Sequence, residues 1–193
     1  DAEKSHSFIQ ILNGDKGTAF YHRFGFSDFN AKEMAFDVNI AGNQFQLERI
    51  SLNIDNELGK ISGELSFKNH HPWDVTLFAP GVMGPFAWLP FMECYHGICS
   101  LDHNIEGHLT IDGETIDFTG GRGYIEKDWG QSFPRGYIWQ QSNHFDVIGT
   151  SLTVSFAEIP NIGRTFAGFI VGLWHEQQLY QFTTYNGTKI EYV

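Results

Sequence analysis

The feature of this sequence that most limits its fold is an alternation of apolar and polar residues with a period of two. Segment 34–40, for example, has Met, Phe, Val and Ile at every second position. This pattern is typical of β-strands that bury one face, because successive side chains of a strand point to opposite sides. We find no run longer than ten residues with the period of an α-helix. The sequence therefore predicts an all-β fold with little helix.

Turn signals divide the alternating segments from one another. Asn13-Gly14 and Asp112-Gly113 are pairs that short hairpin turns favour, because both residues tolerate positive φ. Many short strands joined by hairpins predict an antiparallel barrel, closed or nearly closed, or two such barrels. The predicted strands are 7–12, 18–24, 34–40, 44–47, 50–54, 61–67, 93–101, 105–111, 114–118, 137–142, 150–157, 166–174, 179–184 and 189–193.

Composition excludes two classes of protein. The 193 residues include 18 Phe, 7 Tyr and 5 Trp, and only 18% are charged, so the chain can bury a large core and disorder is excluded. A net charge of −11 would repel a phosphate backbone, which excludes nucleic-acid partners. Cys94 and Cys99 fall on opposite faces of an extended strand, so we expect free thiols and a reducing, cytoplasmic location.

The longest uncharged stretch, Val75 to Met92, approaches the length of a membrane-spanning helix. Pro80, Pro85 and Pro90 remove too many backbone donors for a helix there. We expect a kinked apolar loop instead. Two interpretations stay open: the loop folds over its own core, or it forms the mouth of an apolar ligand cavity.

Common catalytic and metal-binding motifs are absent from the sequence, including Gly-x-Ser-x-Gly, His-Glu-x-x-His and Cys-x-x-Cys. His96, His103 and His108 lie in one region, but spacings of seven and five place neighbours on opposite faces of a strand. We therefore expect no metal and no cofactor.

One segment, 124–135, concentrates charge in a chain that otherwise has little of it. It reads Tyr-Ile-Glu-Lys-Asp-Trp-Gly-Gln-Ser-Phe-Pro-Arg, and on a strand Glu126 and Asp128 share one face while Lys127 points away. Gly130 allows a backbone conformation that other residues adopt at a cost. A purely structural alternative is a corner in which Glu126, Lys127 and Arg135 form ion pairs.

This segment closely resembles the central signature of the tocopherol cyclase family, Tyr-x-Glu-Lys-Asp-Trp-Gly-x-x-Phe-Pro-Arg followed by Trp139 and the Gln141-x-Asn143 pair. The resemblance extends upstream through 90–97 and 107–121, and downstream through Ile159-Pro160 and 180–187. The plant enzymes carry Asn where Asp128 stands, so a catalytic role of Asp128 is not inherited from them.

The resemblance implies a calycin-like architecture of lipocalin-type barrels in tandem. We expect residues 1–123 to form a first barrel that lacks its N-terminal strands, and 124–193 to contain the signature and the opening strands of a second, incomplete barrel. The chain would then be an internal portion of a longer protein. The implied reaction closes a chromanol ring: the trisubstituted double bond of a prenylated quinol is protonated, and the phenolic oxygen captures the tertiary cation.

This chemistry requires a neutral carboxylic acid, which an apolar pocket favours by disfavouring the ionised form. The candidates are Glu126 and Asp128, with Glu93 as a third. Aromatic faces stabilise a cation, and polar side chains anchor a quinol ring. The expected substrate-binding residues are Tyr95, Trp129, Phe133, Tyr137, Trp139, Gln141 and Asn143.

The expected partner is a hydrophobic small molecule such as a prenylated quinol, reached through transient contact with a membrane surface. Two alternatives stay open at this point. The protein is a carrier for a hydrophobic isoprenoid or lipid, which needs no acid, or it hydrates an isoprenoid double bond, which requires one water molecule beside the cation.

Overall fold

The computed structural model describes residues 4–90, 92–161 and 164–191, and these form fourteen β-strands and two short 3-10 helices. The predicted all-β, antiparallel class is confirmed, since every strand pairing with a resolved register is antiparallel. The sheets of the described residues are open, so the barrel closure that we expected is not seen in this part of the chain. No helix within these residues has the length and apolar content needed to span a membrane.

The chain folds into two compact units that are each discontinuous in sequence. Unit 1 contains residues 1–68 and 105–121, and unit 2 contains 69–104 and 122–193. The long strand β8 (Cys94–Ile111) contributes residues to both units. The predicted division into one barrel over 1–123 and the beginning of another over 124–193 stays a prediction, because compactness does not test barrel closure.

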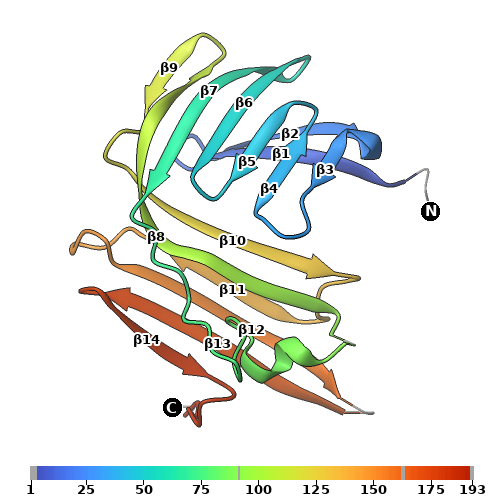
Figure 1. Ribbon diagram of the computed structural model, residues 1–193, viewed down its shortest axis with the longest axis vertical. Coiled ribbons are helices and arrows are strands. Elements are labelled where there is room, and N and C mark those ends of the chain that lie inside the picture. Colours follow the sequence, from blue (N-terminus) through green and yellow to red (C-terminus); the bar gives the residue numbers. More distant parts are fainter. Residues whose placement is uncertain (1–3, 91, 162–163, 192–193) are drawn as a thin grey trace. The chain divides into compact units, whose positions relative to one another are not determined.

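Unit 1 consists of a two-stranded hairpin and an antiparallel sheet with neighbours in the order β7, β6, β5, β4 and β3 (Figure 1). The last residues of β8 pair with β9 in the same unit. Its core consists of alternating strand residues such as Leu52, Ile54 and Ile61, each at most 5% exposed. The elements are β1 (His6–Asn13), β2 (Thr18–Gly25), η1 (Phe26–Asp28), β3 (Phe29–Ala31), β4 (Asp37–Ile40), β5 (Asn43–Gln46), β6 (Arg49–Asn56), β7 (Gly59–Lys68) and β9 (Glu114–Asp117).

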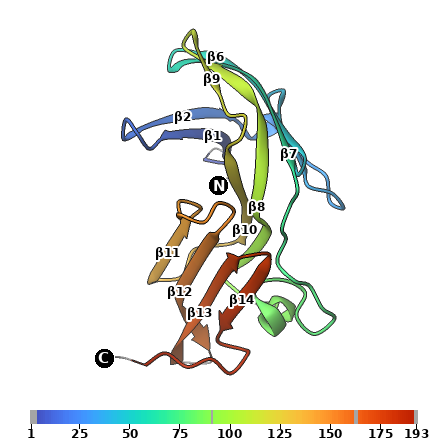
Figure 2. The same cartoon turned by 90° about the vertical axis from the view of Figure 1, so that its left-hand side faces the viewer.

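Unit 2 contains the first residues of β8 paired with β10, and a four-stranded sheet in the order β11, β12, β13 and β14, which Figure 2 shows side by side. The elements are η2 (Gly84–Trp88), β10 (Arg122–Gly130), β11 (Tyr137–Ser142), β12 (Ser151–Asn161), β13 (Arg164–His175) and β14 (Gln178–Thr183).

The predicted apolar loop is confirmed, because the described residues between 69 and 93, which leave out 91, contain only the short helix η2. Val82 and Met83 from this loop are 0% and 8% exposed and pack with Trp73, Ile98 and Leu101. The first of the two interpretations of the loop is thereby confirmed: it covers the core of unit 2.

Three strand predictions were wrong in detail. Segments 93–101 and 105–111 form one strand, β8, because the polar residues between them are buried: Asp102 is 0% and His103 1% exposed. Met34 lies outside β4 and is 96% exposed, so the alternation at 34–40 overestimates the length of that strand. Residues 189–191 form no strand, and the end of the predicted strand 189–193 lies outside the described residues.

Candidate active site

The acidic residues of the signature project from one face of β10, as the alternation predicted. The register places Asp128 directly opposite His96 of β8, and Glu126 opposite Ile98, two residues along the same strand. His96 therefore faces both carboxylates, since diagonal neighbours on an antiparallel pair are also within reach of long side chains. A cluster of one imidazole and two carboxylates results.

His96 lies between the two acids. Its Nδ1 is 2.5 Å from Oδ1 of Asp128, and its Nε2 is 3.7 Å from Oε2 of Glu126. The side chains of His96, Glu126 and Asp128 are 12%, 19% and 32% exposed. The cluster thus becomes more buried from Asp128 towards Glu126 and His96.

Two further side chains hold Glu126 in place. The hydroxyl of Tyr124 donates a hydrogen bond of 2.5 Å to Oε2 of Glu126, and Nε1 of Trp139 donates one of 3.2 Å to the same oxygen. Burial, together with the nearby charge of Glu126, raises the pKa of Tyr124 above its ordinary value of 10.0. The phenol therefore remains a donor across the physiological pH range.

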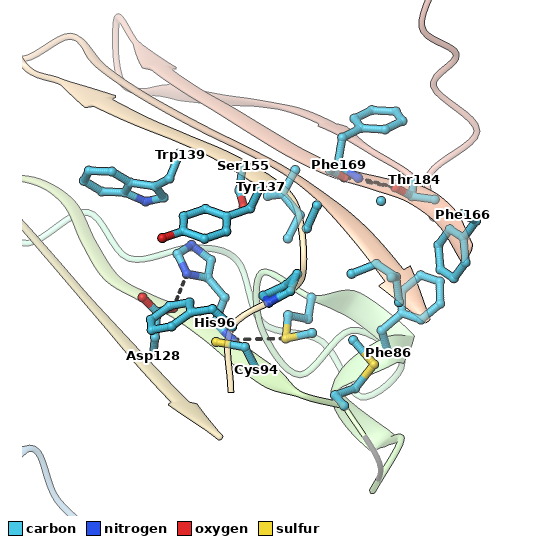
Figure 3. A pocket seen from close by; sticks show the side chains of 18 of the residues that line it. Phe86, Cys94, His96, Asp128, Tyr137, Trp139, Ser155, Phe166, Phe169 and Thr184 are labelled. Atoms are coloured by element: carbon cyan, nitrogen blue, oxygen red, sulfur yellow. Dashed lines mark hydrogen bonds and ion pairs between the residues drawn. The ribbon is translucent and has the colours of Figure 1, made fainter. Parts of the chain in front are cut away.

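A pocket of about 330 Å³ lies beside this cluster, entirely within unit 2 (Figure 3). Strands β8 and β10 provide the polar end, and β11, β12 and β13 provide much of the apolar wall. Met83, Phe86 and Met92 from the apolar loop also line it, so the loop borders this pocket as well as covering the core, and its role as the mouth of a ligand cavity stays a prediction. The remaining lining residues are Cys94, His96, Glu126, Asp128, Phe133, Pro134, Tyr137, Trp139, Ser155, Ala157, Ile159, Phe166, Gly168, Phe169, Ile170, Thr184 and Tyr185.

Figure 3 shows His96, Asp128, Tyr137 and Trp139 at one end of the pocket, and Phe86 and Phe166 at the other. The rings of Phe86 and Phe166 are 5.9 Å apart between centroids. Pockets with mainly apolar walls and a few convergent polar groups are typical sites for small molecules. This pocket is therefore suited to an elongated apolar ligand with one polar end.

The cluster also has the composition of a metal site, because donor atoms of His96, Glu126 and Asp128 lie within 4.8 Å of one another. Two ligands of one tetrahedral ion, each about 2.0–2.1 Å from it, lie about 3.3 Å apart. Nδ1 of His96 and Oδ1 of Asp128 are only 2.5 Å apart. This distance is that of a short hydrogen bond between the two side chains.

Of the nine expected site residues, the structure brings five together at the pocket: Glu126, Asp128, Phe133, Tyr137 and Trp139. Phe133 and Tyr137 stack with ring centroids 5.7 Å apart. The alternative in which Glu126 pairs with Lys127 and Arg135 does not hold within the described residues, where Glu126 contacts Tyr124, Trp139 and His96.

Tyr95 and Trp129 do not line the pocket. They face each other across β8 and β10, with parallel rings 5.5 Å apart, and Nζ of Lys127 lies 4.7 Å from the centre of the Trp129 ring. Lys127 and Trp129 alternate with Glu126 and Asp128, so they project from the other face of β10. Their arrangement is a stack on that face.

Gln141 and Asn143 belong to a separate, partly buried network in unit 2. Nδ2 of Asn143 donates to the carbonyl of Gly123 at 3.2 Å and to Oδ1 of Asp102 at 3.3 Å. Asp102 in turn accepts two hydrogen bonds from Arg122, and Gln141 donates to Asn143. This network ties β10 to the segment after β11, so the two side chains position the site instead of lining it.

Glu93, the third acid candidate, is also absent from the pocket lining. Its carbonyl accepts hydrogen bonds from the backbone N–H groups of Gln131 and Ser132. Cys94 does line the pocket, and burial followed by the charge of Asp128 raises the pKa of its thiol. Both cysteines are free, as predicted.

Sequence reasoning missed His96 as a partner of the acids. The spacing of His96 was considered only relative to other histidines nearby in sequence. The partners of His96, Glu126 and Asp128, lie on the neighbouring strand β10. A pairing of β8 with β10 that matched Tyr95 with Trp129 would have placed His96 opposite Asp128. Tyr124 begins the signature and lies two residues before Glu126. Strand alternation places both side chains on the same face of β10, which was a usable signal for the role of Tyr124.

Comparison with known proteins gives one consistent result. The family model described as tocopherol cyclase-like matches residues 66–192, which include every residue that lines the pocket. A probable chloroplastic tocopherol cyclase of Oryza sativa subsp. japonica is 30% identical over 130 residues, covering 65% of this chain. A chloroplastic tocopherol cyclase of Zea mays is 30% identical over 132 residues, covering 65% of this chain. The matches span only 28% and 27% of these relatives, and no solved structure matches.

Proposed function

The chain belongs to the tocopherol cyclase-like family, and from this premise we propose that unit 2 binds a prenylated quinol and cyclises it to a chromanol. The observation that carries the proposal is a carboxyl group, Glu126, at the polar end of a pocket with mainly apolar walls. The reaction needs an acid that can protonate an alkene, and Glu126 presents a carboxyl group to this pocket.

Glu126 is the better of the two acid candidates. Its Oε2 already accepts hydrogen bonds from Tyr124 and Trp139, so in the neutral carboxyl the transferable proton belongs to Oε1. Asp128 is more exposed and is hydrogen-bonded to His96. We assign Glu126 as the proton donor and give Asp128 a positioning role.

The aromatic lining supports the cationic step. Protonation of the prenyl double bond creates a tertiary carbocation, which aromatic faces stabilise by about 1–2 kcal/mol each when water is excluded. Tyr137 and Trp139 line the pocket at its polar end, where Trp139 is hydrogen-bonded to Glu126, and Phe133 stacks on Tyr137. Phe133, Tyr137 and Trp139 are 63%, 57% and 46% exposed, so the bound substrate itself has to cover these rings to keep water from the cation and favour ring closure over hydration.

The size of the pocket sets which part of the substrate is enclosed. Drug-sized ligands occupy pockets of about 300–1,000 Å³, and this pocket has about 330 Å³. That volume suits the quinol ring and the first prenyl unit, where the reaction takes place. A longer tail would extend out of the pocket.

A lipid-dissolved substrate has to be collected from a membrane, and we propose a transient surface contact for this purpose. The loop that contributes pocket residues also exposes Leu77, Phe78 and Trp88, at 79%, 80% and 64%. Leu77 and Phe78 are adjacent in sequence, and neighbouring exposed apolar residues commonly mark interaction sites. A cytoplasmic location stays a prediction.

Substitution Glu126→Gln tests the function. It keeps the shape and the hydrogen-bond acceptor but removes the transferable proton, so we expect turnover of a prenylated hydroquinone to fall by at least about 100-fold, with binding retained. Chromanol formation is followed by chromatography, and binding by native mass spectrometry. Glu158→Gln, on an exposed side chain of β12 in the same unit, is the matched control and should keep full activity.

The result separates the cyclase from the carrier alternative. Full turnover in Glu126→Gln contradicts the assignment of the acid. Wild-type protein that retains the quinol but never forms a chromanol contradicts the cyclase and supports a carrier.

A further inference from the structure

We propose that His96 is the general base of this reaction, which takes the phenolic proton through Nε2 and returns it to Glu126. The inference rests on the proposed function and adds the step that it leaves open. Cyclisation is an isomerisation, so the proton that the alkene gains must be matched by the proton that the phenol loses. A group other than the spent acid is best placed to accept it while the C–O bond forms.

The first observation is a ring nitrogen without a hydrogen bond. Nε2 of His96 is shielded from solvent and has no hydrogen-bond partner in the described part of the chain. Buried polar atoms are almost always paired, and exceptions are often catalytic. His96 also lines the pocket, so a rotation of its ring that uncovers Nε2 brings this nitrogen to a phenol bound there, which becomes the missing partner.

The second observation concerns which nitrogen carries the proton. The carboxylate of Asp128 accepts hydrogen bonds and does not donate them when ionised. At 2.5 Å from Nδ1, it favours the tautomer with the proton on Nδ1, which leaves the lone pair on Nε2. Asp128 is therefore a positioning residue: it orients the ring and stabilises the imidazolium that forms.

The third observation is the distance of 3.7 Å between Nε2 of His96 and Oε2 of Glu126. This is too long for a hydrogen bond, so the two groups do not exchange a proton in the resting state. A small motion of either side chain, or one water molecule, closes the gap after the product forms.

The proton balance closes without any other reactant. Glu126 gives its proton to the less substituted alkene carbon, whose π electrons form the new C–H bond. The phenolic oxygen forms a C–O bond to the tertiary cation, and its O–H bond breaks as Nε2 of His96 takes the proton. His96 then returns that proton to the Glu126 carboxylate, and both groups regain their starting states.

Removal of the ring tests the base. In His96→Ala we expect kcat to fall by about 100-fold or more while KM changes little, because the phenolic proton loses its best-placed acceptor and only the spent Glu126 carboxylate remains. Added imidazole should restore part of the turnover by occupying the space of the missing ring. The matched control is His144→Ala, an exposed histidine of the same unit outside the pocket, which should keep wild-type turnover and not respond to imidazole.

A spectroscopic measurement that needs no turnover shows which ring nitrogen of His96 carries the proton. Two-bond ¹H–¹⁵N correlation spectra of the wild-type protein, assigned with the His96→Ala variant, should show His96 protonated on Nδ1 and unprotonated on Nε2. A ring protonated on Nε2 at the pH of maximal turnover overturns the inference.

The kinetic outcomes distinguish the two proposals. Loss of activity in Glu126→Gln together with full activity in His96→Ala contradicts the assignment of His96 as the general base and leaves the proposed cyclase function unaffected. His96→Ala that is inactive but unaffected by imidazole, with a raised KM, assigns His96 a merely structural role. A wild-type protein that forms no chromanol overturns the proposed function, and the base with it.

Discussion

At the scale of single residues, the polar end of the pocket depends on how one carboxylate oxygen is held. Oε2 of Glu126 accepts from Tyr124 and Trp139, and the hydroxyl of Tyr124 also lies 3.2 Å from Oγ1 of Thr153. Thr153 is 1% exposed. Tyr124 thus connects the acid on β10 to the interior of the β11–β14 sheet.

Tyr124→Phe should weaken both the site and the fold. It removes one hydrogen bond to the Glu126 carboxyl group and one to a buried hydroxyl, so we expect the free energy of unfolding to fall by about 1–3 kcal/mol in urea denaturation at pH 7. Turnover should also fall, because Glu126 loses a positioning partner. Tyr180→Phe, whose hydroxyl lies on a 40% exposed side chain, is the control and should change stability by less than about 0.5 kcal/mol.

The raised pKa of Tyr124 adds a test at alkaline pH. The folded protein keeps this phenolic proton above pH 10, where the unfolded chain loses it, so the stability contribution of Tyr124 falls as pH rises past its ordinary pKa of 10.0. The stability gap between wild type and Tyr124→Phe should therefore shrink above pH 10. A gap that widens there contradicts the buried, neutral phenol.

The signature predicted the acids better than it predicted the aromatic residues. Glu126, Asp128, Phe133, Tyr137 and Trp139 all line the pocket. Trp129 lies in the same motif but does not line the pocket. It directly follows Asp128 on β10, so its side chain points to the opposite face of the strand from those of the two acids. Strand alternation, applied to the motif itself, would have separated it from them. His96 required the strand pairing, which a single sequence does not contain.

At the scale of elements, the Trp-Gly pair of the signature marks where β10 meets the backbone that enters β8. A Cβ atom on Gly130 would lie 2.2 Å from the carbonyl oxygen of Glu93 and 2.9 Å from Cα of Cys94. The same carbonyl accepts hydrogen bonds from Gln131 and Ser132. A glycine is required at this position by the close approach of two backbones.

Gly130→Ala should therefore destabilise this end of the β8–β10 pair. The clash is with backbone atoms, so relief requires the strands to separate, and we expect a loss of roughly 1–3 kcal/mol in the free energy of unfolding. Hydrogen exchange should show faster exchange for amides 127–132 than in wild type. Gly14→Ala, where a Cβ atom has no neighbour within 4 Å, is the control, and equal effects of the two substitutions contradict this explanation.

Strand existence was predictable from alternation and turn signals, whereas strand ends were not. The Asp112-Gly113 turn forms as expected, with φ of 51° and 87°. The break predicted between 101 and 105 is missing because Asp102 is paired with Arg122 inside the unit. A polar residue such as Asp102 indicates a turn in the sequence, but its ion pair with Arg122 allows it to lie buried within a strand.

At the scale of the whole molecule, the residues with candidate chemistry belong to one unit. Every pocket residue lies in unit 2, and the family match covers residues 66–192. All five tryptophans, Trp73, Trp88, Trp129, Trp139 and Trp174, also lie in this unit. Tryptophan fluorescence therefore reports the unfolding of the unit that contains the candidate site.

Acid should destabilise that unit through His103. The side chain is 1% exposed, its ring lies 5.1 Å from that of His70, and burial followed by the nearby His70 lowers its pKa from 6.5 to about 4. Between these values the unfolded chain binds a proton that the folded protein does not. Stability therefore falls as pH decreases from 6.5 to 4, by about 3 kcal/mol from this residue.

His103→Gln tests this linkage, because glutamine keeps a polar side chain of similar size but does not titrate. Urea denaturation followed by tryptophan fluorescence at pH 7 and pH 4 should show a smaller loss of stability on acidification in the variant than in wild type. His144→Gln, on an exposed histidine of the same unit, should lose as much stability as wild type. Equal acid sensitivity of wild type and His103→Gln would mean that the ring of His103 becomes protonated without unfolding. The close packing of this ring against β10 argues against that outcome, because a Cβ atom on Gly123 would lie 2.2 Å from Nε2 of His103.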